Sequence, residues 1–370
     1  MLINKNKIIN NSYIEHKIHS NNAFNKGKNY LSSIIKISFY KKSVIIFMNF
    51  LLSFIILYHL YSCEEKNIFI KDTIKYDIVI PVNINDTQKL LNHIDFLKRF
   101  LNFENIIIIT RNNSKIITNN HKAIFINEDE LIPINNIKEI FLKRGINENH
   151  RIGWYEQQFL KMSYSTICKN DYYLLWDADT IPIKKINMFD NNHPIFDTKE
   201  EYHHPYFATM ENIISNLHFS KFSYISEHMI IKTEFMKSLI FKIEKNQNIP
   251  GNFYYEKILM CIDSSDINKS GFSEFETYGT FVDNYYPNFY KHRKWYSQRE
   301  MVKFYSKLEN LNDDDFKWLS KDYDAITFEK WDKYEKENFV YIKSIKIHKK
   351  CRPKRFFKYY KRIIKNINLN

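Results

Sequence analysis

Asp177 and Asp179, with Ala178 between them, directly follow the apolar run 172–176 (YYLLW). In an extended segment, side chains two residues apart point to the same side, so both carboxylates can reach one cation. Mg²⁺ and Mn²⁺ suit such a pair, because they bind through one or two carboxylates and keep other positions for substrate phosphates. Since Asp also caps helices and starts turns, the pair alone is weak evidence. Its place after a buried strand is what predicts a site for Mn²⁺ or Mg²⁺.

Apolar runs predict the sheet that positions this pair. The expected strands are 76–82, 105–110, 123–126, 172–176 and 224–231. Helical patterns stand near 87–101, 137–144, 154–167, 232–244, 252–261 and 274–282. Alternating strands and helices predict an α/β fold with a mostly parallel, Rossmann-like sheet flanked by helices. Ligands of such sheets bind beyond the carboxyl ends of the strands, where Asp177 and Asp179 stand.

The predicted helix at 154–167 has a polar face that could touch a ligand. Trp154, Gln158, Lys161 and Ser165 share this face at helical spacing, next to an apolar face that suits the core. A solvated surface explains the same polar pattern, and the spacing alone leaves both interpretations open.

Two later motifs carry further reactive groups. His228 lies in Ser226–Met229 (SEHM), which interrupts an apolar strand, and it suits a metal, a sugar or a purely structural role. In the later motif SEFETYG, Glu274 and Glu276 can serve as a general base on a hydroxyl group. Ser273 with Glu276 three residues later also fits a capping box, which is a structural explanation for Glu276.

The net charge of +13 comes from the two ends of the 370-residue chain. Residues 1–42 hold eight Lys and one Glu, and residues 343–370 hold eleven Lys and Arg and no acid, so 36 basic and 41 acidic residues remain between them. A mildly acidic body predicts no nucleic-acid partner, because a nucleic-acid groove needs positive charge on the folded surface. The chain has six glycines and no G-x-G-x-x-G or P-loop sequence, which argues against a glycine loop that cradles phosphate.

Residues 43–62 contain no Asp, Glu, Lys or Arg. About 20 helical residues span the roughly 30 Å hydrocarbon layer of a membrane. Lys41-Lys42 before the segment and Glu64-Glu65 after it predict a cytosolic N-terminus and a body across the membrane. We expect a signal-anchor and a single-pass, type II membrane protein of the Golgi or endoplasmic reticulum with a lumenal body. A cleaved signal peptide is the alternative, which the long preceding segment disfavours.

The expected organisation is a cytosolic basic tail at 1–42, a transmembrane anchor at 43–62, a stalk at 63–75, one catalytic domain at 76–300 and a C-terminal extension with a basic tail at 301–370. The four cysteines form no C-x-x-C pair, which disfavours a zinc ribbon and leaves disulfides and free thiols open.

Four motifs follow one another in the body: GWYEQQFLK at 153–161, DYY and DADT within 171–180, EHM at 227–229 and SEFETYG at 273–279. Together they resemble a family of largely uncharacterised glycosyltransferases with the GT-A fold, over about residues 76–290. The resemblance implies a nucleotide-sugar donor, Mn²⁺ or Mg²⁺ at Asp177 and Asp179, and a glycan, lipid or protein acceptor. It implies Glu274 and Glu276 as candidate catalytic residues. It implies donor or substrate binding by Pro81, Asn83, Arg111, Trp154, Gln157, Gln158, Lys161, His228 and Tyr278.

Two other functions fit part of the sequence. A phosphatase of the haloacid dehalogenase type also has D-x-D after an apolar strand, with the first Asp as the nucleophile. Such motifs usually continue with Gly-Thr near the start of the domain, whereas Thr180-Ile181 follow here after at least three strands. The other alternative is a catalytically inactive, membrane-bound binding protein on the same fold. A metal-dependent glycosyltransferase is the prediction that accounts for all four motifs.

Overall fold

The computed structural model describes residues 74–111, 123–146, 151–329, 333–334 and 351–367. It separates Met1–Thr73 from a compact unit that begins at Ile74, and all described residues belong to that unit. The predicted basic tail, the membrane anchor and nearly all of the stalk therefore lie outside the described residues. Within the described part, no helix is both long enough and apolar enough to cross a bilayer.

A five-stranded sheet in the order β3-β2-β1-β4-β8 forms the centre of the unit. Its strands are β1 (Tyr76–Pro81), β2 (Ile106–Thr110), β3 (Ala123–Asn127), β4 (Tyr172–Trp176) and β8 (His228–Lys232). β1 pairs in parallel with β2 and β4, and β2 pairs in parallel with β3, whereas β8 runs antiparallel to β4. The predicted α/β fold with a mostly parallel sheet is confirmed, because the buried apolar runs form the inner strands.

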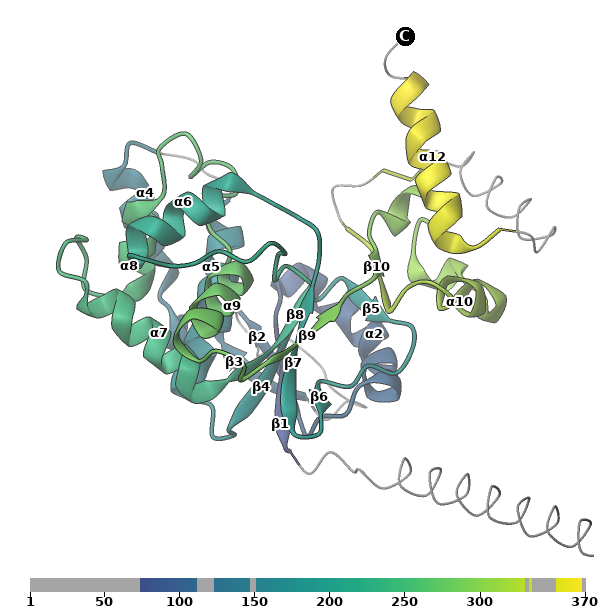
Figure 1. The fold of residues 1–370 in the computed structure, drawn as a ribbon, viewed down its shortest axis with the longest axis horizontal. Coiled ribbons are helices and arrows are strands. Elements are labelled where there is room, and N and C mark those ends of the chain that lie inside the picture. The colour runs from purple at the N-terminus through teal and green to yellow at the C-terminus, as the bar shows by residue number, and fades with distance from the viewer. Residues whose placement is uncertain (1–73, 112–122, 147–150, 330–332, 335–350, 368–370) are drawn as a thin grey trace, which may run out of the picture. The chain divides into compact units, whose positions relative to one another are not determined.

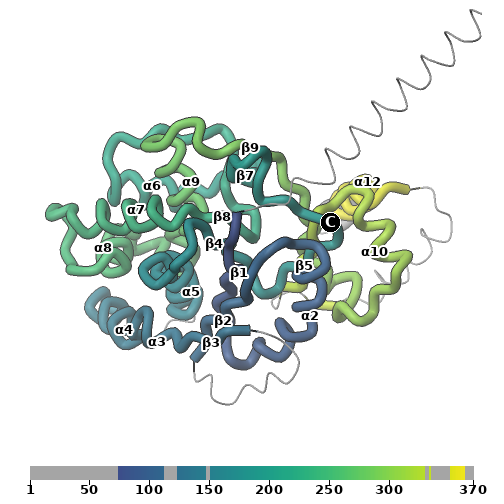
Figure 2. The backbone as a smooth tube through the Cα atoms, turned by 90° about the horizontal axis from the view of Figure 1, so that it is seen from below, coloured from purple at the N-terminus to yellow at the C-terminus, as the bar shows by residue number. Residues whose placement is uncertain are grey.

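Helices lie on both sides of this sheet. α2 (Thr87–Phe100) lies on one side, and α5 (Ile152–Ser163), α7 (Thr233–Lys245), α8 (Tyr254–Cys261) and α9 (Glu274–Tyr285) lie on the other (Figure 1). Figure 2 shows the same division from below. The helices pack through apolar residues at helical spacing, which on α2 are Leu90, Leu91, Ile94 and Leu97. The other helices in this part of the chain are η1 (Ile84–Asp86), α3 (Glu128–Leu131), α4 (Ile134–Lys143), η3 (Tyr164–Thr166) and α6 (His204–Ile213).

A second sheet attaches the C-terminal part of the chain to the segment that follows Asp179. β11 (Ala325–Thr327) pairs antiparallel with β5 (Thr180–Pro182) and parallel with β10 (Ser297–Gln298). An apolar cluster packs around it and includes two phenylalanines of α12 (Pro353–Ile367). Between β10 and β11 the chain forms η4 (Met301–Lys303), η5 (Leu308–Asn310) and α10 (Asp313–Leu319). Residues from the predicted extension therefore pack directly behind the carboxylate pair.

A third sheet is formed by β6 (Phe189–Asp190), β7 (His193–Thr198) and β9 (Lys291–Lys294). β7 pairs antiparallel with β6 and parallel with β9.

The strand predicted at 224–231 begins only at His228, because the chain bends at Glu227. The φ of Glu227 is 61°, a left-handed value that residues other than glycine rarely adopt. In this conformation the Glu227 carbonyl accepts a hydrogen bond from the Asp177 N–H at 2.9 Å. Backbone strain of this kind gathers at functional sites, where surrounding contacts hold it in place.

Candidate active site

Polar side chains from five strands meet at one edge of the central sheet. The carboxyl ends of the four parallel strands share this edge, and the start of antiparallel β8 joins them. In strand order from β3 to β8, the residues at these ends are Glu128, Arg111, Asn83, Asp177 and Glu227. Because ligands of open α/β sheets bind beyond this edge, the structure brings three of the predicted site residues to the expected place.

α5 crosses this edge and contacts two of its strands. Gln157 Nε2 donates to the Pro81 carbonyl oxygen at 3.2 Å, and Lys161 Nζ lies 2.6 Å from Asp177 Oδ1. Lys161 stands about one helical turn beyond Gln157, so the two side chains reach neighbouring strands, β1 and β4. On the polar face predicted for this helix, Gln158, Lys161 and Ser165 are buried, so this face is not a solvated surface.

Lys161 is buried and forms ion pairs with two carboxylates. Its Nζ lies 2.6 Å from both Asp177 Oδ1 and Glu274 Oε1, and 4.3 Å from the centroid of the Phe275 ring. Burial alone would lower the pKa of Lys161, but the two carboxylates outweigh burial and raise it, so Lys161 is a cation. Gln158 Oε1 accepts from the Glu274 N–H at 3.1 Å, which holds the start of α9 against α5.

Asp179 has the least neutralised carboxylate of this edge. Its backbone carbonyl accepts from the Phe328 N–H at 3.1 Å. Within the described residues, no basic side chain forms an ion pair with its carboxylate. Burial, followed by the charges of Asp177, Glu329 and Glu227, raises the pKa of Asp179 to about 7. A carboxylate in this environment either keeps a proton or needs a cation.

Glu227 and Glu329 are themselves neutralised by basic side chains. Arg299 Nε lies 2.8 Å from Glu329 Oε1 and 3.7 Å from Glu227 Oε1. Glu227 also accepts from Trp295 Nε1 at 2.8 Å and from Lys199 Nζ. Burial alone would raise the pKa of Glu227, but Lys199 and Arg299 outweigh burial and lower it, so this carboxylate is ionised.

The donor set at this edge fits a hard divalent cation. The Asp177 side chain is 28% exposed and residue Asp179 is half-buried, so solvent reaches this edge at Asp177. Over the described ranges, no group of three or more His, Cys, Asp or Glu side chains is arranged to hold a metal. A cation here would take two protein carboxylates and fill its other positions with water or substrate oxygens, as Mg²⁺ commonly does. The unneutralised charge of Asp179 favours such a cation.

Arg111, which was predicted to face the donor, holds two buried carboxylates. Its Nη2 lies 3.0 Å from Glu156 Oε1 and also contacts Glu128 Oε1. Burial, followed by the charge of Glu128, raises the pKa of Glu156 to about 8 in spite of Arg111. The guanidinium itself is 41% exposed, so it can still be reached from the sheet edge, and its contact with a donor stays a prediction.

Asn83 and Trp154 flank the same edge. Asn83 is exposed beyond β1, and its side chain accepts from the Asn85 N–H at 3.0 Å. Trp154 is half-buried near the start of α5. The Tyr155 ring lies edge-on to the Trp154 ring at 4.9 Å, and the Arg151 guanidinium lies 5.4 Å from the centroid of the Trp154 ring. Their predicted binding roles stay predictions.

Of the two predicted bases, the described contacts join only Glu274 to the carboxylate pair. Ser273 caps α9 by accepting from the Glu276 N–H at 3.2 Å, but the Glu276 side chain does not complete a capping box. Its Oε2 accepts from Ser223 Oγ at 2.5 Å and from the Tyr224 N–H at 3.2 Å. Its Oε1 is buried without a partner among the described atoms, and burial raises the pKa of Glu276 to about 7.

His228 is buried, with both ring nitrogens engaged inside the chain. Nε2 lies 2.9 Å from Asp197 Oδ2, and Nδ1 lies 2.8 Å from the Ser226 carbonyl oxygen. The ring centroids of Trp176 and Trp295 are 5.0 and 4.4 Å away. These contacts favour the structural role for His228 at the start of β8, and its contact with a ligand stays a prediction.

Tyr278 lies at the opposite end of the sheet from the carboxylate pair, and its predicted binding of donor or substrate stays a prediction that its contacts do not support. Its hydroxyl accepts from the Lys232 N–H at 2.9 Å and lies 3.0 Å from the Tyr290 hydroxyl. Lys232 ends β8, whereas the carboxylate edge lies at the start of this five-residue strand, about 13 Å away. Gly279 follows Tyr278 for a packing reason, since the Tyr224 ring occupies the space that a Cβ would need.

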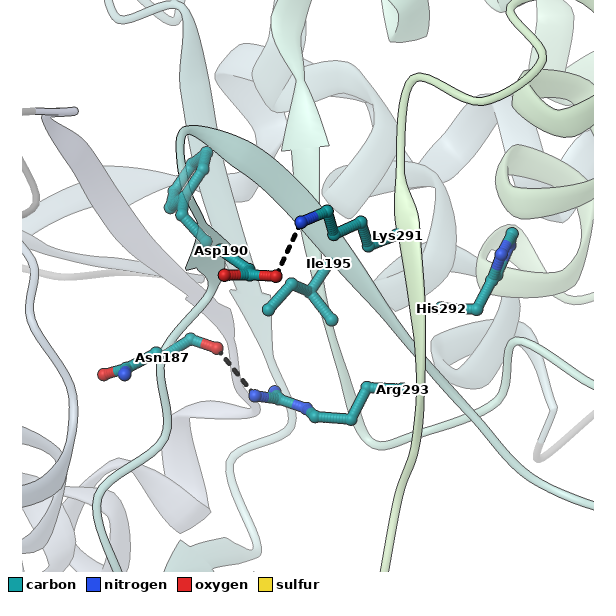
Figure 3. A pocket seen from close by; sticks show the side chains of 7 residues that line it. Asn187, Asp190, Ile195, Lys291, His292 and Arg293 are labelled. Carbon is teal, nitrogen blue, oxygen red and sulfur yellow. Dashed lines mark hydrogen bonds and ion pairs between the residues drawn. The ribbon is translucent and has the colours of Figure 1, made fainter.

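Two hollows lie away from the carboxylate pair. The first, of about 350 Å³, lies beside β9, where Lys291 pairs with Asp190 at 2.6 Å and Arg293 donates to the Asn187 carbonyl at 2.9 Å (Figure 3). The second, of about 580 Å³, adjoins Tyr172 at the other end of β4. Because the cations in the first are already paired and the second lies at the wrong end of the sheet, neither contains the predicted chemistry.

Four residues of the site, Arg299, Glu329, Lys199 and Glu227, were not among those predicted from the sequence. Arg299 and Glu329 follow β10 and β11, in the region where the periodic pattern is weak, and Lys199 follows β7. Only the pairing of β11 with β5 brings Glu329 toward Asp179, and no local spacing encodes that pairing. Glu227 directly precedes His228 in the EHM motif, and this position is the sequence signal that could have identified it.

A family model described as a family of unknown function (DUF6492) matches residues 84–357. This range includes the carboxylate pair, all four motifs and the strands that carry Arg299 and Glu329. No curated protein matches the chain.

Two solved glycosyltransferases overlap loosely with the chain. The apo form of GlyE from Streptococcus pneumoniae TIGR4 overlaps with a TM-score of 0.31 and 11% identity, over 70% of this chain and 56% of that one. The galactosyltransferase LgtC in complex with donor and acceptor sugar analogs overlaps with a TM-score of 0.33 and 9% identity, over 68% of this chain and 86% of that one. The chain thus spans just over half of GlyE. Overlaps this loose do not bear on activity, which has to be inferred from the site.

Proposed function

The chain belongs to the family of unknown function DUF6492, and from its site we propose that it is a metal-dependent glycosyltransferase with a GT-A-like domain. It would transfer a sugar from a nucleotide-sugar donor to a glycan, lipid or protein acceptor. The proposal rests on the Asp177 and Asp179 pair beyond β4, where no described side chain neutralises the Asp179 carboxylate.

Asp177 and Asp179 would hold Mn²⁺ or Mg²⁺. When bound, this cation neutralises the diphosphate of the donor and the charge of the leaving nucleoside diphosphate. Lys161 fixes one oxygen of Asp177 at 2.6 Å, and the Glu227 carbonyl fixes the Asp177 backbone. Asp177 is therefore held in place before a donor arrives, which lowers the cost of binding.

Arg299 is suited to contact the donor phosphates. Its guanidinium is 41% exposed, while Glu329 and Glu227 hold it from one side. Arg carries further N–H donors in a planar fork that matches phosphate oxygens, so the remaining donors are available to a ligand. Burial alone would lower the pKa of Arg299, but both carboxylates outweigh burial and raise it, so Arg299 is a cation.

Glu274 is the better placed of the two candidate bases. It begins α9 beside Asp177, to which Lys161 connects it, and burial raises its pKa. A raised pKa suits a carboxylate that accepts a proton from an acceptor hydroxyl near neutral pH. Glu276 is directed toward Ser223 and the Tyr224 backbone and contributes to the packing of α9.

Residues 43–62 would anchor this enzyme as a single-pass, type II protein with its domain in the lumen of the Golgi or endoplasmic reticulum. In sealed microsomes that contain the full chain, added protease should spare the domain until detergent is present. Digestion of the domain in the absence of detergent would contradict this topology.

Incubation of the purified full chain with a panel of nucleotide-sugars tests the activity. We expect release of a nucleoside diphosphate from at least one donor with Mn²⁺ or Mg²⁺, and none with chelator. Mn²⁺ should also raise the melting temperature, because saturating a site at 100 times its Kd stabilises the folded state by about 2.7 kcal/mol. Full turnover in chelator would refute the proposal, and so would an aspartyl-phosphate trapped on Asp177, which indicates a phosphatase.

A further inference from the structure

The segment 199–206 follows β7 and begins at the carboxylate site. Lys199 Nζ contacts the Glu227 carboxylate, and the Lys199 backbone exchanges two hydrogen bonds with Ser223 at 2.9 and 2.8 Å. Since Glu227 holds the Asp177 backbone, the start of this segment is fixed beside the proposed reaction centre.

Tyr202 presents an open aromatic face three residues later. It is 73% exposed, the highest value among the exposed aromatic and aliphatic side chains of the described part. Its other face stacks on the buried Phe207 ring, with centroids 4.6 Å apart and an angle of 12°. Phe207 is in turn held edge-on by Phe219 at 5.0 Å. The Tyr202 ring is thus held in one orientation although it lies in solvent, which costs a ligand little ordering entropy.

An acidic side chain, Glu201, directly precedes Tyr202 in this segment. Glu201 is 41% exposed and lies 3.9 Å from Lys199 Nζ. Lys199 also contacts Glu227, which Arg299 Nε approaches at 3.7 Å. Glu201 is therefore connected through Lys199 to Glu227 at the reaction centre.

We propose that segment 199–206 is an acceptor subsite that stacks one pyranose ring of a neutral oligosaccharide on Tyr202 and accepts its hydroxyls on Glu201. This inference rests on the proposed glycosyltransferase function. A pyranose has an apolar C–H face and a hydroxyl-rich rim, which match a flat aromatic ring beside a carboxylate. Four chain positions from Lys199 to Tyr202 span at most about 10 Å, and we assign the stacked ring to the sugar next to the reacting one. The acceptor therefore has at least two sugar units.

The acidic residues of the segment argue against an anionic acceptor. Glu200 pairs with Lys294, but Glu201 shares Lys199 with the buried Glu227, so its charge is only partly compensated. A phosphorylated or carboxylated acceptor would be repelled at this rim, whereas sugar hydroxyls donate to a carboxylate.

Acceptor kinetics of the full chain test the inference, with lactose, maltose and cellobiose and their component monosaccharides as probes. For the disaccharide that is used, Tyr202→Ala should raise the acceptor KM about tenfold, and Tyr202→Trp should restore it, because stacking contributes about this factor. The matched control is Tyr285→Ala, which removes a 43% exposed tyrosine at the far end of α9, about 16 Å from Glu274 along the helix. It should leave the acceptor KM unchanged.

Three results would overturn the subsite. They are an unchanged disaccharide KM in Tyr202→Ala, an equal rise in the donor KM, and efficient transfer only to lipid or peptide acceptors that ignore the substitution. Each leaves metal-dependent release of the nucleoside diphosphate intact in the wild type. Loss of that release in the wild type would instead refute the proposed function, so the two failures can be told apart.

Discussion

Two groups of acidic side chains lie at the same edge of the central sheet and are neutralised to different degrees. Beyond β2 and β3, Arg111 binds both Glu128 and Glu156. Beyond β4, Lys161 binds Asp177, but no described side chain neutralises Asp179. The first group is closed on itself, whereas the second has negative charge left for a ligand.

The difference shows what separates a structural acid cluster from a binding site. Glu156, with a pKa of about 8, keeps its proton at neutral pH, so Arg111 and one ionised carboxylate complete the group without a ligand. Asp179, with a pKa of about 7, is partly ionised at the same pH, and a divalent cation can displace its proton. Acidic residues at the end of a strand are therefore insufficient evidence for a binding site. The informative feature is a carboxylate that no basic side chain of the protein neutralises.

The largest expected effect is the loss of turnover in Asp179→Asn. Removing one carboxylate from the metal pair should lower kcat/KM about 10³-fold, or about 4 kcal/mol, measured as release of nucleoside diphosphate. The melting temperature should not fall, because the substitution also removes like-charge repulsion. Glu156→Gln makes the same chemical change in the closed group and should alter kcat/KM by a few-fold at most. Equal losses in both variants would erase the distinction between the two groups.

A smaller effect is expected on stability when the cation is removed from each group. Lys161→Met leaves the buried Glu274 and the partly buried Asp177 unpaired and should cost about 3 kcal/mol in urea unfolding at pH 7. Arg111→Met should cost less, because Arg111 is 41% exposed and both of its partners can take up protons. A larger loss for Arg111→Met would show that the closed group depends on its cation more than the open one does.

The smallest effect is a pH-dependent gain in stability for Glu156→Gln. The pKa of Glu156 is raised from 4.5 in the unfolded chain to about 8 in the folded protein. The stability that its protonated form contributes is fully present below pH 4.5 and is lost as the pH rises to about 8. A glutamine carries no such penalty, so the variant should gain on the order of 2 kcal/mol over the wild type between pH 4.5 and 9. A difference in unfolding free energy between the variant and the wild type that stays the same at all pH values would contradict this.

The sequence predicted the central sheet well, because buried strands of apolar and β-branched residues leave a local pattern. β4 was expected at 172–176 and is found there, and β1 and β2 differ from the prediction by one residue at one end. The apolar face of α2 was likewise readable from its spacing. The sheet therefore placed Asp177 and Asp179 at the correct edge before any contact was known.

The partners of the carboxylate pair were harder to predict, because they depend on contacts between distant segments. Tyr278 shares a motif with Glu274, but one turn of α9 carries it away from the sheet edge. Arg299 and Glu329 stand in a region of weak periodicity and arrive through a three-residue strand. The direction of one side chain on a helix and a strand of three residues both leave too short a sequence pattern to be predicted.

The pairing of β5 with β11 sets the order in which this site can form during synthesis. β5 ends at Pro182, whereas its partner begins at Ala325, so the ribosome must add more than a hundred residues before the pair can close. The five-stranded sheet is complete by Lys232, and proteins generally fold from the N-terminus as they emerge. Refolding should therefore restore the sheet signal in circular dichroism before Mn²⁺ protection appears, since distant contacts form slowly. Simultaneous recovery of both signals would contradict this order.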